Sequence, residues 1–384
     1  MPDTSSRRQI KARRGSPALQ VAYVLAYRAP KYIRTESLLT ALGYVNEVEI
    51  AVARNKHPGL RRYVETLNAL RKLRREIASD IYVIGFRGHE IFWLIRWLTR
   101  GKPLIIDAMM SPYAALHDEY GNRMPHRWLA KMIYPLERWI LRRADLVLTD
   151  TRLHAEFYAR TFDLPIEHFC PLPVGAIEPV SNAAPSAYGK STPFSVLFYG
   201  SFLPLHGIQV IVSAAARLVD LPIRFDFIGG SKAQALGLHH LCQMSGVTNF
   251  SYRRWVEFEQ LLRHDIPNAD LCLGGPFGGT PQARRVVTTK TSQCLALGKA
   301  TVIGHIDEDY GFVDRGNCLL VAQADADALA NSIRWAFENR ASLTELGARG
   351  RDVYHERLST HVIATRLQSA LNRLAANSTE AHAG

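Results

Sequence analysis

Short apolar runs along the chain alternate with longer segments in which apolar residues recur every three or four positions. Between residues 18 and 178 the short runs occupy 21–25, 47–53, 81–85, 103–106 and 146–149. Runs that are apolar throughout are typical of strands covered on both faces, and helices between them are the usual connections of a parallel sheet. The pattern therefore predicts an α/β fold whose N-terminal, Rossmann-like and doubly wound domain spans 18–178.

The alternation stops at 179–193, "PVSNAAPSAYGKSTP", which has no periodicity and is predicted as a linker. It restarts with strand-like runs at 194–199, 223–228, 249–252, 269–273, 300–303 and 318–321, which predicts a second Rossmann-like domain over 194–358. Helices are expected at about 327–339 and 349–357, and a C-terminal helix with a frayed tail over 359–384. We expect the two domains to face each other across a cleft outside the carboxyl ends of both sheets. Ligands of such folds bind at that position.

Positive charge is concentrated in the first half of the chain. The net charge is +12; residues 1–180 hold 28 Lys and Arg against 18 Asp and Glu, whereas residues 181–384 hold 19 against 17. An anionic partner therefore belongs to the first half, which begins with a basic arm, 1–17, that we expect to be disordered. Nucleic acid is disfavoured because no RRM, KH, zinc-finger or helix-turn-helix signature is found. Five cysteines without paired spacing predict a reducing cytoplasm.

Two segments carry candidate phosphate chemistry. In "FSVLFYGSFLPLHGIQVIVSAAARL", 194–218, a strand ends near Gly200, and His206 precedes a helix whose N-terminal N–H groups can bind an anion. A plain βα turn is the alternative. In "GGTPQARRVVTTKTSQCLALGKATVIG", 278–304, three cations converge on a loop before another helix, with Thr289 or Thr291 as its cap: Arg284, Arg285 and Lys290. A solvated basic loop is the alternative there.

These segments, with "FIGG" at 227–230 and "RRADLVLTDTRLHAEFY" at 142–158, resemble the retaining, nucleotide-sugar-dependent glycosyltransferases of the GT-B fold, in family four. The resemblance covers about residues 20–373. It implies a donor nucleotide held by the second domain and an acceptor held by the first. It assigns donor binding to seven residues of the second domain: Gly200, Ser201, His206, Gly207, Gln293, Arg254 and Trp255.

The resemblance also implies a candidate catalytic set of Lys290, Arg285 and Asp107, with no metal and with the nucleoside-diphosphate sugar as donor substrate rather than a cofactor. The family's two glutamates, eight positions apart, are replaced here by Arg285 and Gln293. Gln293 can accept a ribose hydroxyl through its amide oxygen but brings no charge. Asp107, at a predicted strand end, is a sugar or acceptor contact, or alternatively caps the next turn.

Asp150 and His154 follow another predicted strand. Asp150 is interpreted first as the N-cap of the next helix and second as a substrate contact.

Two segments of the basic half combine apolar periodicity with cations. Leucines and other apolar residues recur at helical spacing over 60–77 among six Lys and Arg, and "HEIFWLIRWLTRGK", 89–102, adds Trp93 and Trp97. A basic amphipathic helix can lie on an anionic lipid surface. The alternative is that both stripes pack on the sheet.

The sequence therefore predicts a cytoplasmic glycosyltransferase of the hexosyltransferase type, retaining and acting in polysaccharide biosynthesis, that moves a sugar to a glycan or lipid-linked acceptor. Peripheral contact with the inner face of the membrane is a further hypothesis. The alternatives are a nucleotide-sugar epimerase of similar fold and a non-catalytic partner of a glycan or a membrane complex.

Overall fold

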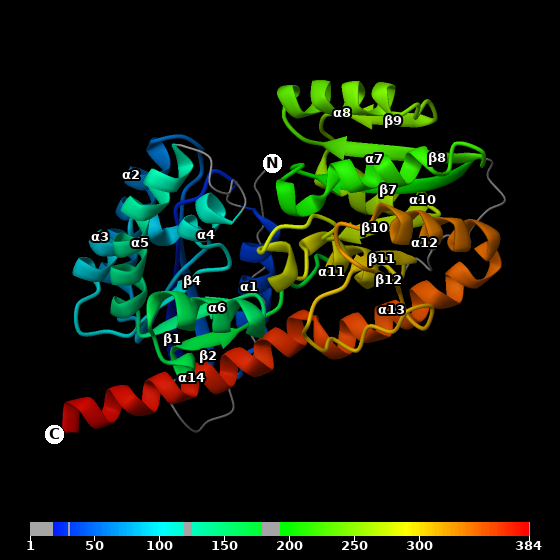
Figure 1. The fold of residues 1–384 in the computed structure, drawn as a ribbon. Helices are drawn as coiled ribbons and strands as arrows, with labels where there is room; N and C mark the ends of the chain where they lie inside the picture. Colours follow the sequence, from blue (N-terminus) through cyan, green and yellow to red (C-terminus); the bar gives the residue numbers. More distant parts are fainter. Residues whose placement is uncertain (1–17, 30, 119–124, 179–192, 384) are drawn as a thin grey trace, which may run out of the picture.

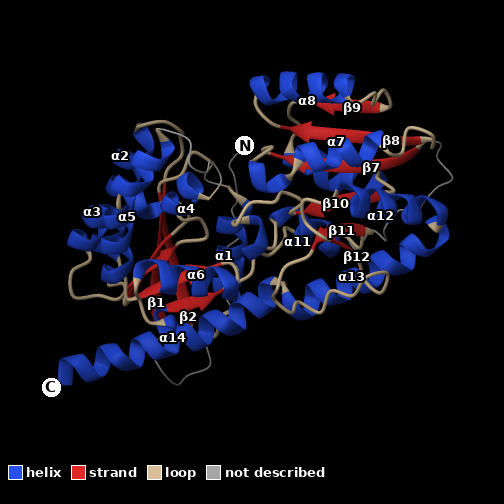
Figure 2. Ribbon diagram, in the orientation of Figure 1, coloured by secondary structure: helices blue, strands red, loops and turns tan. Residues whose placement is uncertain are grey.

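A computed structural model describes residues 18–29, 31–118, 125–178 and 193–383. The basic arm predicted at 1–17 lies outside these residues, and so does the linker predicted at 179–193 except for residue 193. The described chain forms two α/β domains, each with a six-stranded parallel sheet between layers of helices (Figures 1 and 2). The prediction of two doubly wound domains is therefore confirmed.

The first sheet has the strand order β2-β1-β3-β4-β5-β6. Its strands are β1 (Leu19–Leu25), β2 (Val48–Arg54), β3 (Ile81–Ile84), β4 (Leu104–Asp107), β5 (Leu146–Thr149) and β6 (Phe169–Pro171). The helices between them are α1 (Ile33–Tyr44), α2 (Arg61–Glu76), α3 (Phe92–Leu98), α4 (Pro112–His117), α5 (His126–Arg143) and α6 (Arg152–Phe162). Strand β6 was not predicted, because a three-residue strand that ends in proline has no recognisable period.

The second sheet has the order β12-β11-β10-β7-β8-β9, the arrangement of dinucleotide-binding domains. Its strands are β7 (Phe194–Gly200), β8 (Ile223–Gly229), β9 (Phe250–Arg253), β10 (Leu271–Gly275), β11 (Thr301–Gly304) and β12 (Leu319–Val321). Its longer helices are α7 (Ile208–Ala216), α8 (Lys232–Met244), α11 (Thr289–Ala296), α12 (Ala326–Glu338) and α13 (Leu343–Arg357). The short helices α9 (Phe258–Gln260) and α10 (Ile266–Asn268) flank a π-helical turn.

The last helix, α14 (Thr360–Ala383), returns from the second domain to the first and passes under α1 (Figure 1). Ile363, Leu367 and Leu371 of α14 are buried in the same cluster as Leu38 and Leu42 of α1. The chain thus crosses between the domains twice, and the first domain is completed by the C-terminal end of the chain. The backbone remains helical to Ala383, where the sequence predicts a frayed tail.

The basic helix α2 packs on the first sheet through part of its stripe. Leu70 and Leu73 are buried in the core that also contains Val24 and Ile84, while Leu60 and Val64 at its start are exposed. The alternative of sheet packing is thus correct for the C-terminal half of this helix. Among the described residues, no helix combines the length and the apolar character needed to cross a bilayer.

Candidate functional site

A cavity of about 360 Å³ opens between the two domains. The second domain contributes the loop after β7 and the start of α11, at the carboxyl ends of β7 and β10, where the strand order of the sheet reverses. Doubly wound sheets bind their ligands at this kind of position. The first domain contributes side chains from the loops after β1, β4, β5 and β6, namely Tyr32, Met109, Met110, Asp150 and Val174.

The loop after β7 is shaped by glycines with a positive φ. Gly200 ends the strand at φ +146°, and Gly207 begins α7 at φ +67°. A Cβ on Gly207 would lie 2.6 Å from the backbone nitrogen of Gly278, so the close approach of the β10 loop excludes any side chain there. Gly200, Ser201 and His206 line the cavity. The predicted donor loop therefore lies at the interdomain cavity, and Gly207 joins this loop to α7.

His206 is buried and uncharged in this structure. Its Nδ1 accepts the backbone N–H of Leu203 at 3.3 Å, so the proton of the neutral ring is on Nε2. Burial, and secondarily the charge of Lys290, hold the pKa of His206 well below its ordinary value. The ring therefore offers a neutral hydrogen-bond donor.

Lys290 is the one Lys or Arg among the described residues that line the cavity. It is buried at the second position of α11, with its Nζ 5.3 Å from the centre of the Phe198 ring. No ion pair of Lys290 with a carboxylate is found in the described part of the chain. Burial lowers the pKa of its amine to about 7. A Cβ on Gly200 would lie 3.5 Å from this Nζ, so the amine and the β7 loop face each other.

The helix start beside Lys290 adds its own positive field. Thr288, rather than Thr289 or Thr291, is the N-cap of α11: its Oγ1 accepts the N–H of Thr291 at 3.2 Å and donates to Gly274 O at 2.6 Å. With this cap the helix begins at Thr289, so Lys290 lies in its first turn. A buried amine, a helix N-terminus and a neutral imidazole are together suited to bind an anion.

Solved structures of other proteins superpose on most of this chain. Sucrose-phosphate synthase from Thermosynechococcus elongatus superposes with a TM-score of 0.69 at 16% identity, covering 94% of this chain and 100% of the other. HepE from Anabaena, in complex with UDP-glucose, gives 0.66 at 14% identity, with 92% and 100% covered. TarM from S. aureus, in complex with fondaparinux, α-GlcNAc-glycerol and UDP, gives 0.58 at 12% identity, with 80% and 59% covered.

The chain has the GT-B fold. No family model matches its sequence, and no curated protein is similar to it in sequence.

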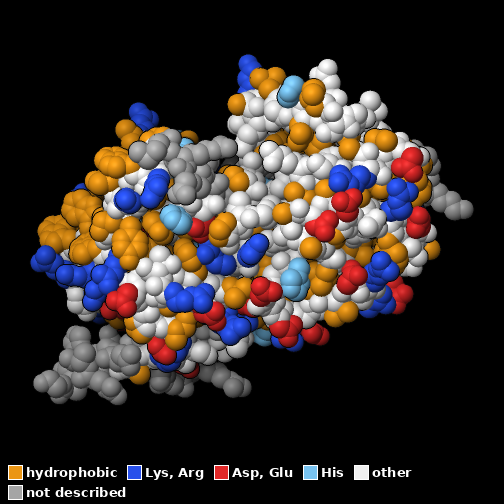
Figure 3. Space-filling view, viewed as in Figure 1, with side chains coloured by type: hydrophobic (Ala, Val, Ile, Leu, Met, Phe, Trp, Pro, Cys, Tyr) orange, Lys and Arg blue, Asp and Glu red, His pale blue; other side chains and the backbone are white. Residues whose placement is uncertain are grey.

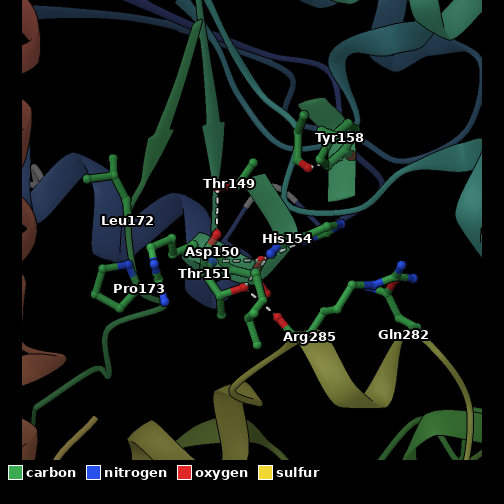
Figure 4. Close-up of polar contacts among 12 residues, drawn as sticks. Thr149, Asp150, Thr151, His154, Tyr158, Leu172, Pro173, Gln282 and Arg285 are labelled. Atoms are coloured by element: carbon green, nitrogen blue, oxygen red, sulfur yellow. Dashed lines mark hydrogen bonds and ion pairs between the residues drawn. The ribbon is translucent and has the colours of Figure 1, made fainter. Parts of the chain in front are cut away.

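Arg285 lies at the domain boundary of this GT-B chain and does not line the cavity. Its guanidinium pairs with Asp118 of the first domain and lies 3.7 Å from the centre of the Phe157 ring. Its backbone oxygen accepts the hydroxyl of Thr151 (Figure 4). The guanidinium also donates to Oε1 of Gln282 in its own domain at 3.3 Å. Arg285 thus has partners in both domains, and its contact with a diphosphate stays a prediction.

Gln293 is buried on α11 and is held by the chain that leads out of the first domain. Its Oε1 accepts the N–H of Ile177 and its Nε2 donates to the oxygen of the same residue, both at 3.0 Å. Both ends of the amide are therefore satisfied by one peptide segment. In this arrangement Gln293 connects α11 to the interdomain segment, and its contact with a ribose stays a prediction.

Asp107 ends β4 and is fully buried against Arg34 of α1, with Oδ1 3.1 Å from Nη2 and Oδ2 3.1 Å from Nε. Arg34 also donates to the backbone oxygens of Thr149, Leu172 and Pro173. One ion pair thus holds α1 to the carboxyl ends of β4, β5 and β6. The carboxylate of Asp107 is directed to Arg34 rather than to the next turn, and Asp107 is not among the cavity-lining residues.

Asp150 is the one acidic residue among the described residues that line the cavity. Its Oδ1 accepts from His154 Nδ1 at 2.7 Å and from the N–H of Thr151 at 3.0 Å (Figure 4). The N-cap of α6 is Thr151, whose hydroxyl accepts the N–H of His154 at 3.0 Å. Capping by Asp150, the first interpretation from sequence, is therefore wrong. The buried His154 ring instead fixes a carboxylate at the first-domain side of the cavity, opposite Lys290.

Arg254 and Trp255, predicted to surround a nucleotide base, are exposed after β9 and outside the cavity lining.

Sequence reasoning missed Tyr32, which lines the cavity and stacks on Phe86 at 5.0 Å between ring centres. Its position in the loop after the first strand of a doubly wound sheet is the signal that could have found it. No cluster of metal-ligating side chains occurs in the described ranges.

Proposed function

We propose that the protein transfers a hexosyl group from a nucleoside-diphosphate sugar to a glycan or lipid-linked acceptor, with retention. One observation carries the proposal: the buried amine of Lys290, unpaired among the described residues, lies at a helix N-terminus beside His206 and the β7 loop. A desolvated cation of this kind is stabilised by an anion, and a diphosphate also suits the N–H groups around it. The complexes of HepE with UDP-glucose and of TarM with UDP support a nucleotide-sugar donor for a chain of this fold.

The chemistry follows from the charges around the cavity. The bond from the anomeric carbon to the diphosphate oxygen breaks, and a bond to the acceptor oxygen forms on the same face of the sugar. The ammonium of Lys290 offsets charge that grows on the leaving diphosphate, and the Nε2 proton of His206 donates a hydrogen bond to it. The acceptor proton passes to the departing phosphate oxygen, so the protein need not supply a strong base. Asp150, across the cavity, holds an acceptor hydroxyl. No metal and no further cofactor belong to this proposal.

The first experiment is calorimetric binding of UDP, GDP and ADP, each with its sugars, to the purified protein and to Lys290→Ala. We expect one nucleotide class to bind selectively and Lys290→Ala to lose that binding. Transfer by this variant should fall by at least about tenfold, or ~1.4 kcal/mol of transition-state stabilisation. Lys290→Arg is the matched control, because it keeps the charge at the same position.

Normal turnover by a folded Lys290→Ala protein would contradict the assignment. If no nucleotide binds to well-folded protein, the non-catalytic alternative gains support, and the engagement of Gln293 by Ile177 would be its structural reason. Product analysis in the absence of acceptor separates transfer from epimerisation, since an epimerase changes the donor sugar alone. Retention is read from the anomeric configuration of the product. Peripheral contact with the inner face of the membrane is a separate hypothesis, which a transfer assay does not test.

A further inference from the structure

The first domain carries a surface that is both apolar and exposed, formed by α3 and the outward side of α5. We name it the tryptophan face. It consists of six side chains, each 41% to 61% exposed: Trp93, Trp97, Trp128, Met132, Leu136 and Trp139. Figure 3 shows hydrophobic side chains gathered over these two helices, with Lys and Arg around them. Four of the chain's six tryptophans lie on this one face.

The exposed apolar residues of α5 are spaced so that they lie along one side of the helix. Ala130, Ile140 and Leu141 on its inner side are buried. Trp128, Met132, Leu136 and Trp139 follow at intervals of four, four and three, which is a second apolar stripe on the opposite side. A helix that covers a sheet needs only the inner stripe. A continuous exposed apolar patch indicates an interaction site.

The two helices form one continuous surface. The ring of Trp139 on α5 meets Phe92 of α3 edge-on, with the ring centres 6.2 Å apart. Trp93 and Trp97 are one helical turn apart on the outer side of α3. Only Trp93 and Trp97 belong to a segment for which the sequence suggested membrane contact. The exposed stripe of α5 could be identified only from the structure, which shows the side of the helix that is buried.

Cations surround the tryptophan face. Residues 88–102 and 126–145 hold eight Lys and Arg against three acids, and one of those acids, Glu137, is buried. The guanidinium of Arg143 lies 5.5 Å from the ring centre of Trp139. Arg100, Lys131 and Arg142 form no ion pair within the described part of the chain. Exposed tryptophans mixed with free cations are the composition of helices that lie in the interface of an anionic bilayer.

We propose that the tryptophan face docks on the surface of an anionic lipid membrane, with its indole rings at the level of the headgroups and its cations on lipid phosphates. Charge complementarity selects this occupant over a second copy of the chain. A two-fold contact would bring the same cations against one another without acids to offset them. An anionic bilayer instead offers many phosphates to every cation.

The face is connected to the first-domain side of the cavity through α4. Oε2 of the buried Glu137, on the inner side of α5, accepts the N–H of Tyr113 in α4 at 2.8 Å. Asp118, at the end of α4, pairs with Arg285 at the domain boundary. These contacts join the helix that carries the face to the domain boundary. The extension of docking to a lipid-linked acceptor rests on the proposed function, whereas the docking itself does not.

The test is co-sedimentation of the full chain with vesicles of phosphatidylcholine alone and of phosphatidylcholine mixed with phosphatidylglycerol, without nucleotide. We expect partition onto the phosphatidylglycerol vesicles and little onto the neutral ones. A combined variant, Trp93→Ser, Trp97→Ser, Trp128→Ser and Met132→Ser, should lower the partition coefficient by at least about tenfold. High salt should also weaken binding, since it screens the cations. These four side chains are exposed, so the fold should be retained, as circular dichroism can verify.

Leu236→Ser with Met244→Ser is the matched control. Both side chains are exposed on α8 of the second domain, and this variant should bind vesicles as the unchanged protein does. Failure of the unchanged protein to bind phosphatidylglycerol vesicles would overturn the proposal. So would equal binding by the fourfold variant, or a dimer in sedimentation that the same four substitutions abolish. Because no sugar or nucleotide is present, vesicle binding without any transferase activity would overturn the proposed function alone.

Discussion

At the scale of single residues, the chemistry of the cavity depends on Lys290 being only partly protonated near neutral pH. Burial lowers the pKa of its amine to about 7 in the free protein. A bound diphosphate favours the charged form and raises that pKa again. Below pH 7 the amine is already charged, so binding should leave it unchanged. Above pH 7 binding must be accompanied by proton uptake.

Proton uptake can be measured by calorimetry in two buffers of different ionisation enthalpy. With the nucleotide sugar as ligand, we expect little uptake at pH 6 and about one proton at pH 8, with affinity falling as the pH rises above 7. A nucleotide sugar is the proper ligand, since its diphosphate has no terminal phosphate that titrates in this range. Lys290→Arg should bind without proton uptake, because its guanidinium is always charged. Identical uptake by both proteins would show that another group titrates.

At the scale of elements, one buried ion pair holds helix α1 against three strands. Arg34 on α1 contacts Asp107 at the end of β4, the backbone oxygen of the last residue of β5, and a backbone oxygen just after β6. Both side chains are fully buried. Removing one partner of such a pair leaves an uncompensated charge in a medium of low dielectric constant. Asp107 therefore stabilises the fold of the first domain, whatever else it contacts.

Asp107→Asn should accordingly lower the free energy of unfolding by about 3–5 kcal/mol. Urea denaturation followed by circular dichroism measures this change. The double variant Arg34→Met with Asp107→Leu should lose less stability than Asp107→Asn, because it leaves no unpaired charge. Unaltered stability of Asp107→Asn together with a loss of transfer would instead indicate a direct contact with substrate.

At the scale of the whole molecule, the two domains are connected by groups from distant parts of the sequence. Arg285 of the second domain pairs with Asp118 and covers Phe157 of the first. In the opposite direction, Glu308 accepts the N–H groups of Arg152 and Leu153, at 3.2 and 3.0 Å, at the start of α6. A carboxylate at a helix N-terminus is favourable. These contacts hold together the two domains that contribute Lys290 and Asp150 to the cavity.

Arg285→Ala should therefore uncouple donor binding from transfer. We expect its affinity for the nucleotide sugar to stay within about twofold of the unchanged protein, while transfer falls about tenfold. Calorimetry and a transfer assay on the same preparation give both quantities. Arg284→Ala, at the exposed neighbouring position, is the control and should change neither. A loss of donor affinity as large as that of Lys290→Ala would instead support the predicted contact of Arg285 with the diphosphate.

The sequence by itself determined the elements and the local loops. Every strand that it predicted is present, with ends that differ by at most two residues, because buried runs and turn glycines are local patterns. Gly200, His206 and Lys290 were singled out for the same reason, because each is defined by the strand or helix end on which it lies, and all three line the cavity.

Only the tertiary structure decided the partners of these residues. Arg285 meets Asp118 from 167 positions away, Gln293 meets Ile177 from 116, and Arg34 meets Asp107 from 73. A basic or polar residue near a helix start has the same appearance in sequence whether it faces a phosphate or another domain. The docking of α14 on α1 and the exposed stripe of α5 depend likewise on which surfaces the fold covers. Those choices are made by packing between distant segments, which periodicity along the chain does not record.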